Sequence, residues 1–276
     1  MKLRNRVVFS CVLVLALLCA CAHVQEGSVS RSPAPVLDRI LKRGELVVGT
    51  AGGMPPLNMT TKTGDIIGFE IDLARKMASA MGVKLRVEPM EFSKLLPALE
   101  KGKVDMVLSG MTITPARNLK VAFVGPYFIS GKAFLTKIET IAKAKDATEV
   151  NSPNVRLTAL RGSTSQYFVE QVLPKVQLVP AKDYDEAVKL VLQGKVNAMI
   201  ADYPICLVSV YRYPNEGLLS VITPLTYEPL GIAVPSYDPH LVNWVENFLA
   251  SLEETGGMDE LKERWFEDVS WLNQLP

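Results

Sequence analysis

Arg117 is the residue whose position most clearly suggests chemistry. It follows a turn rich in hydroxyl groups, residues 109–114, and this turn comes directly after the apolar segment 104–108. Ligands of open α/β sheets bind outside the carboxyl ends of the strands, and a guanidinium group matches a carboxylate with two parallel hydrogen bonds. The spacing therefore indicates a pocket for a small carboxylate. The alternative is a solvated surface arginine after a Ser/Thr turn, and the spacing alone does not separate the two.

Two other turns carry groups that could complement such a ligand. Ser163 and Thr164 lie in a turn, residues 162–165, that opens a helix, where free N–H groups and the helix dipole favour an anion; a plain N-cap is the alternative. Asp202 directly follows the apolar segment 196–201 and could hold an ammonium group or cap the next helix. The guanidinium group of Arg117 and the helix start at residues 162–165 suit a carboxylate, and the carboxylate of Asp202 suits an ammonium group. Together they suit a zwitterion, which carries both.

Apolar faces for a ligand side chain are offered by Met54 and Phe92, although buried aromatics more often belong to the core. Both residues lie in turns that follow predicted strands. If two lobes face each other, all such turns can converge on one cleft: residues 51–58, 89–92, 109–117 and 162–165, and Asp202.

Two series of alternating strands and helices must position these turns. The first series places strands at 46–50, 83–87 and 104–108 and helices at 36–43, 69–81 and 95–99. The second places strands at 155–160 and 196–201 and helices at 166–173, 185–193 and 204–211. Extended segments 128–137 and 225–234 are interpreted as crossings, and helices 239–254 and 258–266 close the chain. The predicted fold is α/β, with two lobes of open, mostly parallel sheets flanked by helices.

The predicted boundaries follow from these crossings. The first lobe takes residues 36–132 and 228–276, and the second lobe takes residues 133–227.

Composition excludes several other classes of protein. The chain has 276 residues, a formal net charge of +1, 48% hydrophobic and 21% charged residues, which is a globular composition without the basic excess of a nucleic-acid-binding protein. Downstream of residue 21 only Cys206 remains, so no intramolecular disulfide is expected, and His23 and His240 are too few for a metal site. We expect no metal, no cofactor and no catalytic residue, and no transmembrane helix after the leader.

The N-terminus has the features of a leader. Three positive charges within residues 2–6 precede an apolar segment, residues 7–20, that is too short to span a bilayer comfortably. It ends in Leu18-Cys19-Ala20-Cys21, which resembles the bacterial lipobox and predicts a signal peptide at 1–20 and lipidation at Cys21. A secretory signal cut elsewhere, or a retained anchor helix, is the alternative. Residues 21–35 are polar and Ser/Pro-rich and are interpreted as a flexible tether with a reach of about 20 Å.

The stretch 37–265 resembles the family 3 solute-binding proteins, the polar amino-acid-binding components of bacterial ABC importers. The resemblance rests on several motifs: LDRILKRGELVVGT, IIGFEIDLARKMASAMGVK, LLPALEKGKVDMVLSGMTITPAR, GPYFISG, LRGSTSQ and GKVNAMIADYP. It implies the two-lobe type II periplasmic-binding-protein fold.

The resemblance also implies a role for each candidate residue. Arg117, supported by Thr112, would pair with the α-carboxylate of an amino acid, and the turn at Ser163 and Thr164 would add backbone donors from the second lobe. The α-ammonium group would bind Asp202, with help from the carbonyl of Gly110 and from Ser109. Met54 and Phe92 would flank the ligand side chain.

The chain departs from the cation-binding members of the family. Those members carry an acid at the position of Ala51 and often an aromatic residue at Met54, and some place polar or basic contacts at Leu160 and Ala201. All four positions are apolar here, which favours a neutral ligand over a cationic one. The identity of the amino acid does not follow from the sequence.

The expected protein is thus a monomeric receptor, anchored by lipid on the periplasmic or cell-surface side of a membrane, that delivers an amino acid to an ABC permease of the inner membrane. One alternative is an enzyme resembling periplasmic cyclohexadienyl dehydratases, which would need a general acid or base in the cleft, with Glu91 as a loose candidate. A receptor that signals through a separate partner is the other.

Overall fold

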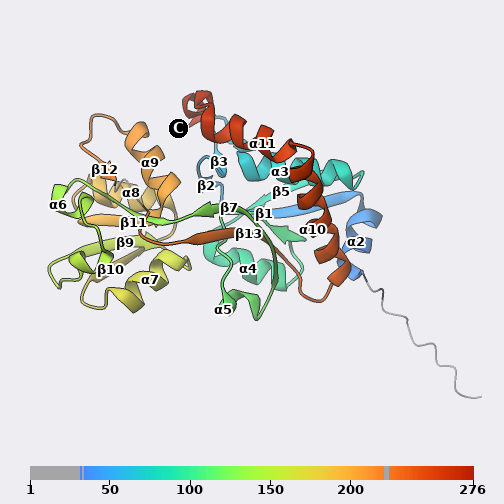
Figure 1. Ribbon diagram of the computed structural model, residues 1–276, viewed down its shortest axis with the longest axis horizontal. Coiled ribbons are helices and arrows are strands. Elements are labelled where there is room, and N and C mark those ends of the chain that lie inside the picture. Colours follow the sequence, from blue (N-terminus) through green and yellow to red (C-terminus); the bar gives the residue numbers. More distant parts are fainter. Residues whose placement is uncertain (1–31, 33, 221–223) are drawn as a thin grey trace, which may run out of the picture. The chain divides into compact units, whose positions relative to one another are not determined.

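The computed structural model describes residue 32 and residues 34–220 and 224–276 (Figure 1). The predictions for the signal peptide, for lipidation at Cys21 and for most of the tether lie outside these residues. Residues 34–276 form one compact unit. Within the described part of the chain, no helix has the length and apolar character needed to span a bilayer.

The first sheet has the strand order β5 (Lys84–Pro89), β1 (Glu45–Thr50), β6 (Met106–Val107), β13 (Glu228–Val234), β7 (Ala122–Ser130). Strand β1 pairs in parallel with β5 and β6, and β13 pairs antiparallel with β6 and β7. The helices of this lobe are α2 (Pro35–Arg43), α3 (Phe69–Ala80), α4 (Phe92–Glu100), α5 (Pro115–Asn118), α10 (Pro239–Glu254) and α11 (Gly257–Lys262). We call this sheet and its helices the first lobe.

The second sheet has the order β10 (Gln177–Ala181), β9 (Arg156–Leu160), β11 (Ala198–Asp202), β8 (Lys132–Thr136), β12 (Leu219–Ser220). Strand β9 pairs in parallel with β10 and β11, whereas β8 is antiparallel to β11 and β12. Its helices are α6 (Glu139–Ala142), α7 (Thr164–Val172), α8 (Tyr184–Leu192) and α9 (Tyr203–Arg212), with a 3₁₀ turn, η1 (Ala147–Val150). We call this sheet and its helices the second lobe.

The chain passes between the lobes at two neighbouring places. Strand β7 ends at Ser130 and β8 begins at Lys132, and β13 begins at Glu228 beside Ser130. Figure 1 shows β7 and β13 side by side where they lead toward the second sheet. Because only these two strands connect the sheets among the described residues, they are the natural place for a hinge.

The apolar periodicity of α3 explains its packing. Phe69, Leu73 and Met77 recur every four residues and are fully buried, so one face of the helix packs into the core of the first lobe. Beyond α11 the chain continues through a π-helical turn, η2 (Glu263–Glu267), and a 3₁₀ helix, η3 (Ser270–Gln274).

Some predicted elements were wrong in extent. The strand expected at 104–108 is confined to Met106–Val107, because the residue before it, Asp105, directs its buried carboxylate to the N–H of Val47. Helix α7 begins at Thr164, two residues before the predicted start, because the Ser163 side chain caps it.

A small antiparallel sheet of β2 (Gly53–Met54), β3 (Asn58–Thr60) and β4 (Ile66–Ile67) occupies a segment that was expected to be loop. Strands β10 and β12 were also missed.

Candidate ligand-binding site

Arg117 is positioned by the short helix α5. Thr114 caps this helix by accepting a hydrogen bond from the backbone N–H of Arg117, and Pro115 occupies its first position. The guanidinium donates from Nη1 to the carbonyl of Thr112 (2.8 Å) and from Nη2 to the carbonyl of Gly162 (3.2 Å), which belongs to the second lobe. It also lies 5.7 Å from the centre of the Phe92 ring. Arg117 is therefore not a solvated surface side chain. It forms hydrogen bonds to residues of both lobes.

Asp202 ends strand β11 and is 5% exposed. Its Oδ1 atom has no hydrogen-bond partner among the described residues. Helix α9 begins at the next residue, yet Asp202 provides no side-chain cap, so the helix-cap interpretation was wrong. A buried carboxylate oxygen without a partner is costly, which makes it a strong candidate to receive a ligand donor.

The charged groups around Asp202 shift its pKa in opposite directions. Burial raises the pKa of Asp202 to about 6, while Lys132 and Arg117 act to lower this pKa and Glu228 acts to raise it. Burial also lowers the pKa of the Arg117 guanidinium, and Asp202 and Glu228 partly offset that effect. Both groups thus lie in a site where charge is poorly solvated.

A buried ion pair that sequence reasoning missed lies beside Asp202. Lys132 is 1% exposed, faces Asp202 directly across the β8–β11 pair, and has its Nζ atom 3.0 Å from Oε1 of Glu228. Lys132 donates to Oγ1 of Thr164 (2.8 Å), which donates in turn to Glu228 Oε2 (3.1 Å). The available signal was a lysine and a glutamate, each isolated at the edge of an apolar extended segment.

The turn at the start of α7 combines two roles. Ser163 is a plain N-cap, because its hydroxyl accepts the N–H of Gln166 (3.1 Å). The hydroxyl of Thr164 instead lies 3.3 Å from that of Thr112 in the first lobe. Thr164 therefore joins the ion pair to the loop that carries Arg117.

A buried carboxylate, Glu70, organises the loops of the first lobe. It accepts the N–H of Gly110 (2.7 Å), the amide of Asn58 (2.5 Å) and the hydroxyl of Tyr127. Gly110 has φ 58°, and a Cβ atom there would lie 2.0 Å from the sulfur of Met54, so only glycine leaves room for Met54 to pack on this turn. The position of Glu70 in the first turn of a helix suggests only an interaction with the helix dipole, so this role was missed.

Ser109 is already engaged with the neighbouring strand end. Its Oγ atom accepts the N–H of Ala51 (2.9 Å), which leaves the hydroxyl one further lone pair and its proton for other partners. This bond ties the turn after β6 to the turn after β1.

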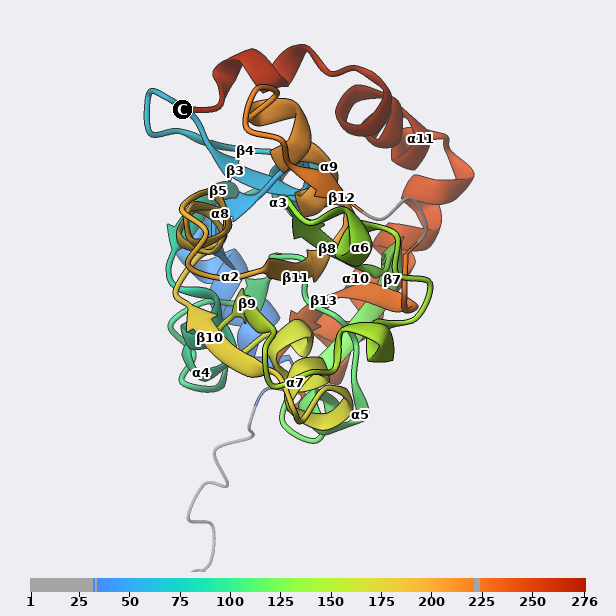
Figure 2. The same ribbon diagram turned by 90° about the vertical axis from the view of Figure 1, so that its left-hand side faces the viewer.

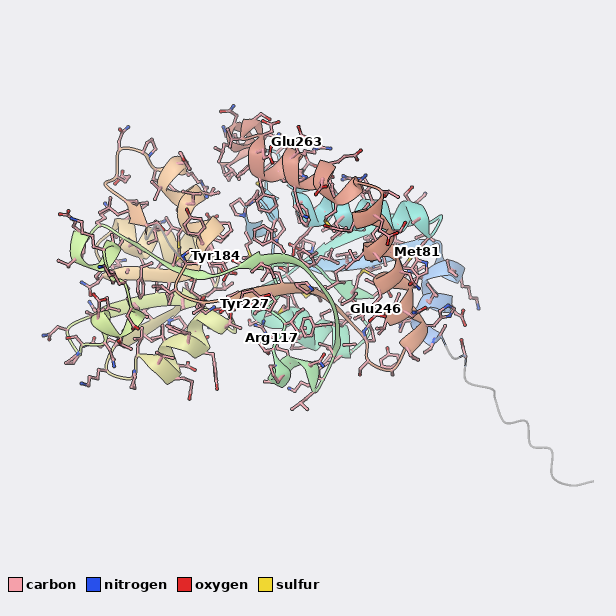
Figure 3. The ribbon with its side chains drawn as sticks, in the orientation of Figure 1. Met81, Arg117, Tyr184, Tyr227, Glu246 and Glu263 are labelled. Atoms are coloured by element: carbon pink, nitrogen blue, oxygen red, sulfur yellow. The ribbon has the colours of Figure 1, made fainter. Side chains whose placement is uncertain are left out.

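Apolar residues of both lobes meet beside these charges. Met54 and Phe92 are 3% and 7% exposed. A pocket of about 160 Å³ brings Ala51 and Phe92 of the first lobe against Leu160 and Tyr184 of the second. In Figure 3, Arg117 and Tyr184 lie in the region where the two lobes meet. No group of His, Cys, Asp and Glu able to hold a metal ion occurs among residues 34–220 and 224–276.

Glu91 lies at the rim of this pocket. Its side chain is 46% exposed and pairs with Lys94 at 3.0 Å. A half-exposed, ion-paired carboxylate is poorly suited to be a general acid, so the structure offers Asp202 rather than Glu91 for such a role.

Two facing sheets, two connecting strands and oppositely charged groups at their junction define a two-lobe binding protein of the type II periplasmic-binding-protein fold. The chain belongs to the bacterial extracellular solute-binding proteins, family 3, whose family model matches residues 46–268. It is 26% identical to the cyclohexadienyl dehydratase of Pseudomonas aeruginosa over 90% of this chain and 92% of that protein. It is 27% identical to the ABC transporter arginine-binding protein 1 of Escherichia coli, over 79% of this chain and 89% of that protein.

A solved structure supports the same assignment. The chain is 40% identical to the putative binding component of an ABC transporter from Wolinella succinogenes, whose structure was determined as a complex with lysine. The match has a TM-score of 0.78 and covers 84% of this chain and 99% of that chain.

Proposed function

We propose that this protein is a lipid-anchored receptor that captures an amino acid by lobe closure and delivers it to an ABC permease. The observation that carries the proposal is the pair of charged groups at the lobe junction, the Arg117 guanidinium and the buried, unpartnered Oδ1 of Asp202. A zwitterion supplies one complementary charge to each. No bond of the ligand is made or broken.

Each end of the amino acid has its own partners. The free edge of the Arg117 fork takes the α-carboxylate, with Thr112 and the backbone N–H of Thr164 beside it. The N–H of Ser163, expected as a second donor, already donates to the carbonyl of Leu160 (3.1 Å). Asp202 takes the α-ammonium group, and the Gly110 carbonyl and the Ser109 hydroxyl are its proposed further acceptors. Met54 and Phe92 flank the ligand side chain.

The side-chain pocket favours a neutral ligand. Ala51, Phe92 and Leu160 present no charge to it, and the acids at its rim, Glu91 and Asp183, are paired with Lys94 and Lys182 at 3.0 and 3.6 Å. A ligand with a cationic side chain would therefore find no free buried acid at this rim.

A thermal-shift screen of the twenty amino acids and small dicarboxylates tests the proposal. A ligand at 100 times its Kd stabilises a protein by about 2.7 kcal/mol, and Arg117→Ala provides the matched control because it removes the carboxylate partner. We expect stabilisation of the wild-type protein by one or a few amino acids and a much smaller stabilisation of the variant at the same concentrations. Stabilisation by no amino acid would contradict the proposed function.

A dehydratase is the second candidate. Asp202, with a pKa of about 6, is partly protonated near neutrality and could donate a proton to a departing hydroxyl group. A turnover assay with prephenate or arogenate separates the candidates: product formation that is abolished by Asp202→Asn supports the enzyme, and its absence supports the receptor.

Anchoring is tested separately. If Cys21 is acylated, Cys21→Ser abolishes metabolic palmitate labelling and leaves the protein unanchored or unprocessed. Labelling that persists in the variant would contradict the lipid anchor without affecting the proposed ligand site.

A further inference from the structure

The last residues of the chain lie beyond the stretch that the family model matches. The family model ends at residue 268, whereas η3 and the residues after it continue to Pro276. This C-terminal segment, residues 269–276, contains two well-buried apolar side chains, Trp271 (5% exposed) and Leu275 (6% exposed). A segment that buries a tryptophan is part of the folded structure.

The C-terminal segment is held to the first lobe by several hydrogen bonds. Trp271 donates from its indole N–H to the carbonyl of Trp265 (3.1 Å). The backbone N–H of Lys62 donates to the carbonyl of Gln274 (2.9 Å), and Lys62 Nζ donates to that of Asn273 (3.1 Å). The segment thus rests on η2 and on the β3–β4 turn.

The same segment also contacts the second lobe. Arg212, the last residue of α9, donates to the backbone oxygen of Pro276 from Nε (3.2 Å) and from Nη2 (2.9 Å). Figures 1 and 2 both show the C-terminus beside α9. The C-terminal segment is therefore hydrogen-bonded to both lobes. It links them at a place separate from the two connecting strands, β7 and β13.

Apolar side chains line the space between the segment and α9. A groove of about 210 Å³ has Tyr203, Leu207 and Tyr211 of α9 on one side and Trp271 and Leu272 on the other. Its two walls belong to different lobes, so a hinge motion that separates the lobes must change its width. Widening it exposes apolar surface to water, which is unfavourable.

We propose that residues 269–276 form a latch that holds the two lobes together and biases the protein toward the closed form. This latch rests on the lobe closure of the proposed function. A ligand that binds the closed form benefits from any bias toward it, since apparent affinity scales with the populated fraction of the competent state. Removing the latch should therefore open the free protein and weaken amino-acid binding.

The first test needs no ligand. Arg212→Gln removes the guanidinium group that donates twice to Pro276 without changing the chain length. Asp185→Asn is the matched control, because it removes the charge of the other partner of Arg212 (2.8 Å) and leaves the latch contact in place. Small-angle scattering of the ligand-free full chain should show a larger radius of gyration for Arg212→Gln than for the wild type or Asp185→Asn. Equal radii in all three proteins would overturn the latch.

The second test measures binding. A chain truncated after Asp268, and Arg212→Gln in the full chain, are titrated with L-glutamine, L-lysine and L-arginine as probes. Coupling between such elements typically changes affinity by about 5- to 150-fold, and we expect a loss in this range together with faster dissociation. The combined variant should lose no more affinity than the truncation alone, because both changes remove the same contact.

The outcomes separate the latch from the proposed function. Unchanged affinity and dissociation rate in Arg212→Gln overturn the latch even if the truncated chain fails to fold. Failure of the wild type to bind any amino acid contradicts the proposed function, and the scattering comparison still decides the latch.

Discussion

Asp202, the residue proposed to bind the α-ammonium group, opposes the stability of its own fold. Burial raises its pKa from 3.8 to about 6, so between these values the native carboxyl group keeps a proton that the unfolded chain has already lost. The native state then binds more protons than the unfolded state, and the stability of the free protein falls as pH rises through this window. Above about pH 6 the penalty is fully present.

Asp202→Asn should therefore stabilise the ligand-free protein at pH 7.5. A shift of about two pKa units corresponds to roughly 3 kcal/mol, which is an upper bound on the gain. Urea unfolding at pH 7.5 and pH 4 measures it, and the difference between variant and wild type should vanish at pH 4. A variant less stable than the wild type at pH 7.5 would show that the carboxylate has partners that stabilise it in the fold.

The same titration should govern ligand binding. The α-ammonium group needs an ionised Asp202, so affinity for an amino acid should fall as pH drops below about 6, by at most about tenfold per pH unit. Titration calorimetry between pH 5 and pH 8 measures this dependence. Asp202→Asn should bind weakly at every pH without this slope; an identical slope in the variant would place the titrating group elsewhere.

Substitution of Arg117 removes both a positive charge and a hydrogen bond between the lobes, and both losses should weaken amino-acid binding. Removing one member of a buried charge pair costs about 2–5 kcal/mol, so Arg117→Ala should weaken amino-acid binding by roughly 30- to several-thousand-fold. Lys120→Ala, at an exposed position three residues on, is the charge-matched control. Calorimetry on both variants measures the effect, and equal affinities would remove Arg117 from the site.

At the scale of elements, the start of helix α3 holds a loop of the site in place. The N–H groups of Phe69 and Glu70 donate to the carbonyls of Pro56 and Leu57 (3.0 and 2.9 Å), which satisfies donors that every helix start leaves free. Gly68 makes this possible, because its φ is 137° and a Cβ atom there would lie only 2.3 Å from the carbonyl oxygen of Leu57. The loop so held directly follows Met54 of β2.

Gly68→Ala should consequently destabilise the protein by more than backbone strain alone, which is about 1–3 kcal/mol. Gly82→Ala is a matched control, because Gly82 also has a positive φ, 68°, but no atom within 4 Å of the position that the alanine methyl group would take. Urea unfolding compares the two variants. Equal destabilisation would mean that the loop moves aside without cost.

At the scale of the whole folded unit, the two connecting strands allow the lobes to move as bodies. The contacts of Arg117 with Gly162 and of Thr112 with Thr164 join the lobes directly. The buried ion pair of Lys132 and Glu228 lies where the chain passes from one lobe to the other. Closure should therefore make and break few contacts inside each lobe.

Ligand should compact the protein. The radius of gyration from small-angle scattering should fall when a saturating amino acid is added to the wild type, because the ligand's charges draw the two lobes together. Arg117→Ala at the same ligand concentration should show a smaller decrease. An unchanged radius in the wild type at saturation, with binding verified by calorimetry, would contradict closure by hinge motion.

The sequence by itself determined the local features of this protein. The four-residue apolar spacing of Phe69, Leu73 and Met77 predicted α3, and Pro115 predicted the start of α5, because both signals depend only on nearby residues. The order of strands and helices predicted two α/β lobes, and the motifs indicated the family. Hydroxyl-rich turns after apolar segments indicated where a ligand could lie.

Only the tertiary structure decided which distant side chains meet. Lys132 and Glu228 are 96 positions apart in the numbering, and their pairing depends on where the chain passes between the lobes. Arg212 meets Pro276 only because the residues after η3 reach the end of α9. Likewise, nothing local shows that Asp202 leaves the next helix uncapped and keeps an oxygen without a partner among the residues that the structure describes. Periodicity reports which face of an element is buried, whereas these contacts depend on register and on how elements far apart in the chain pack together.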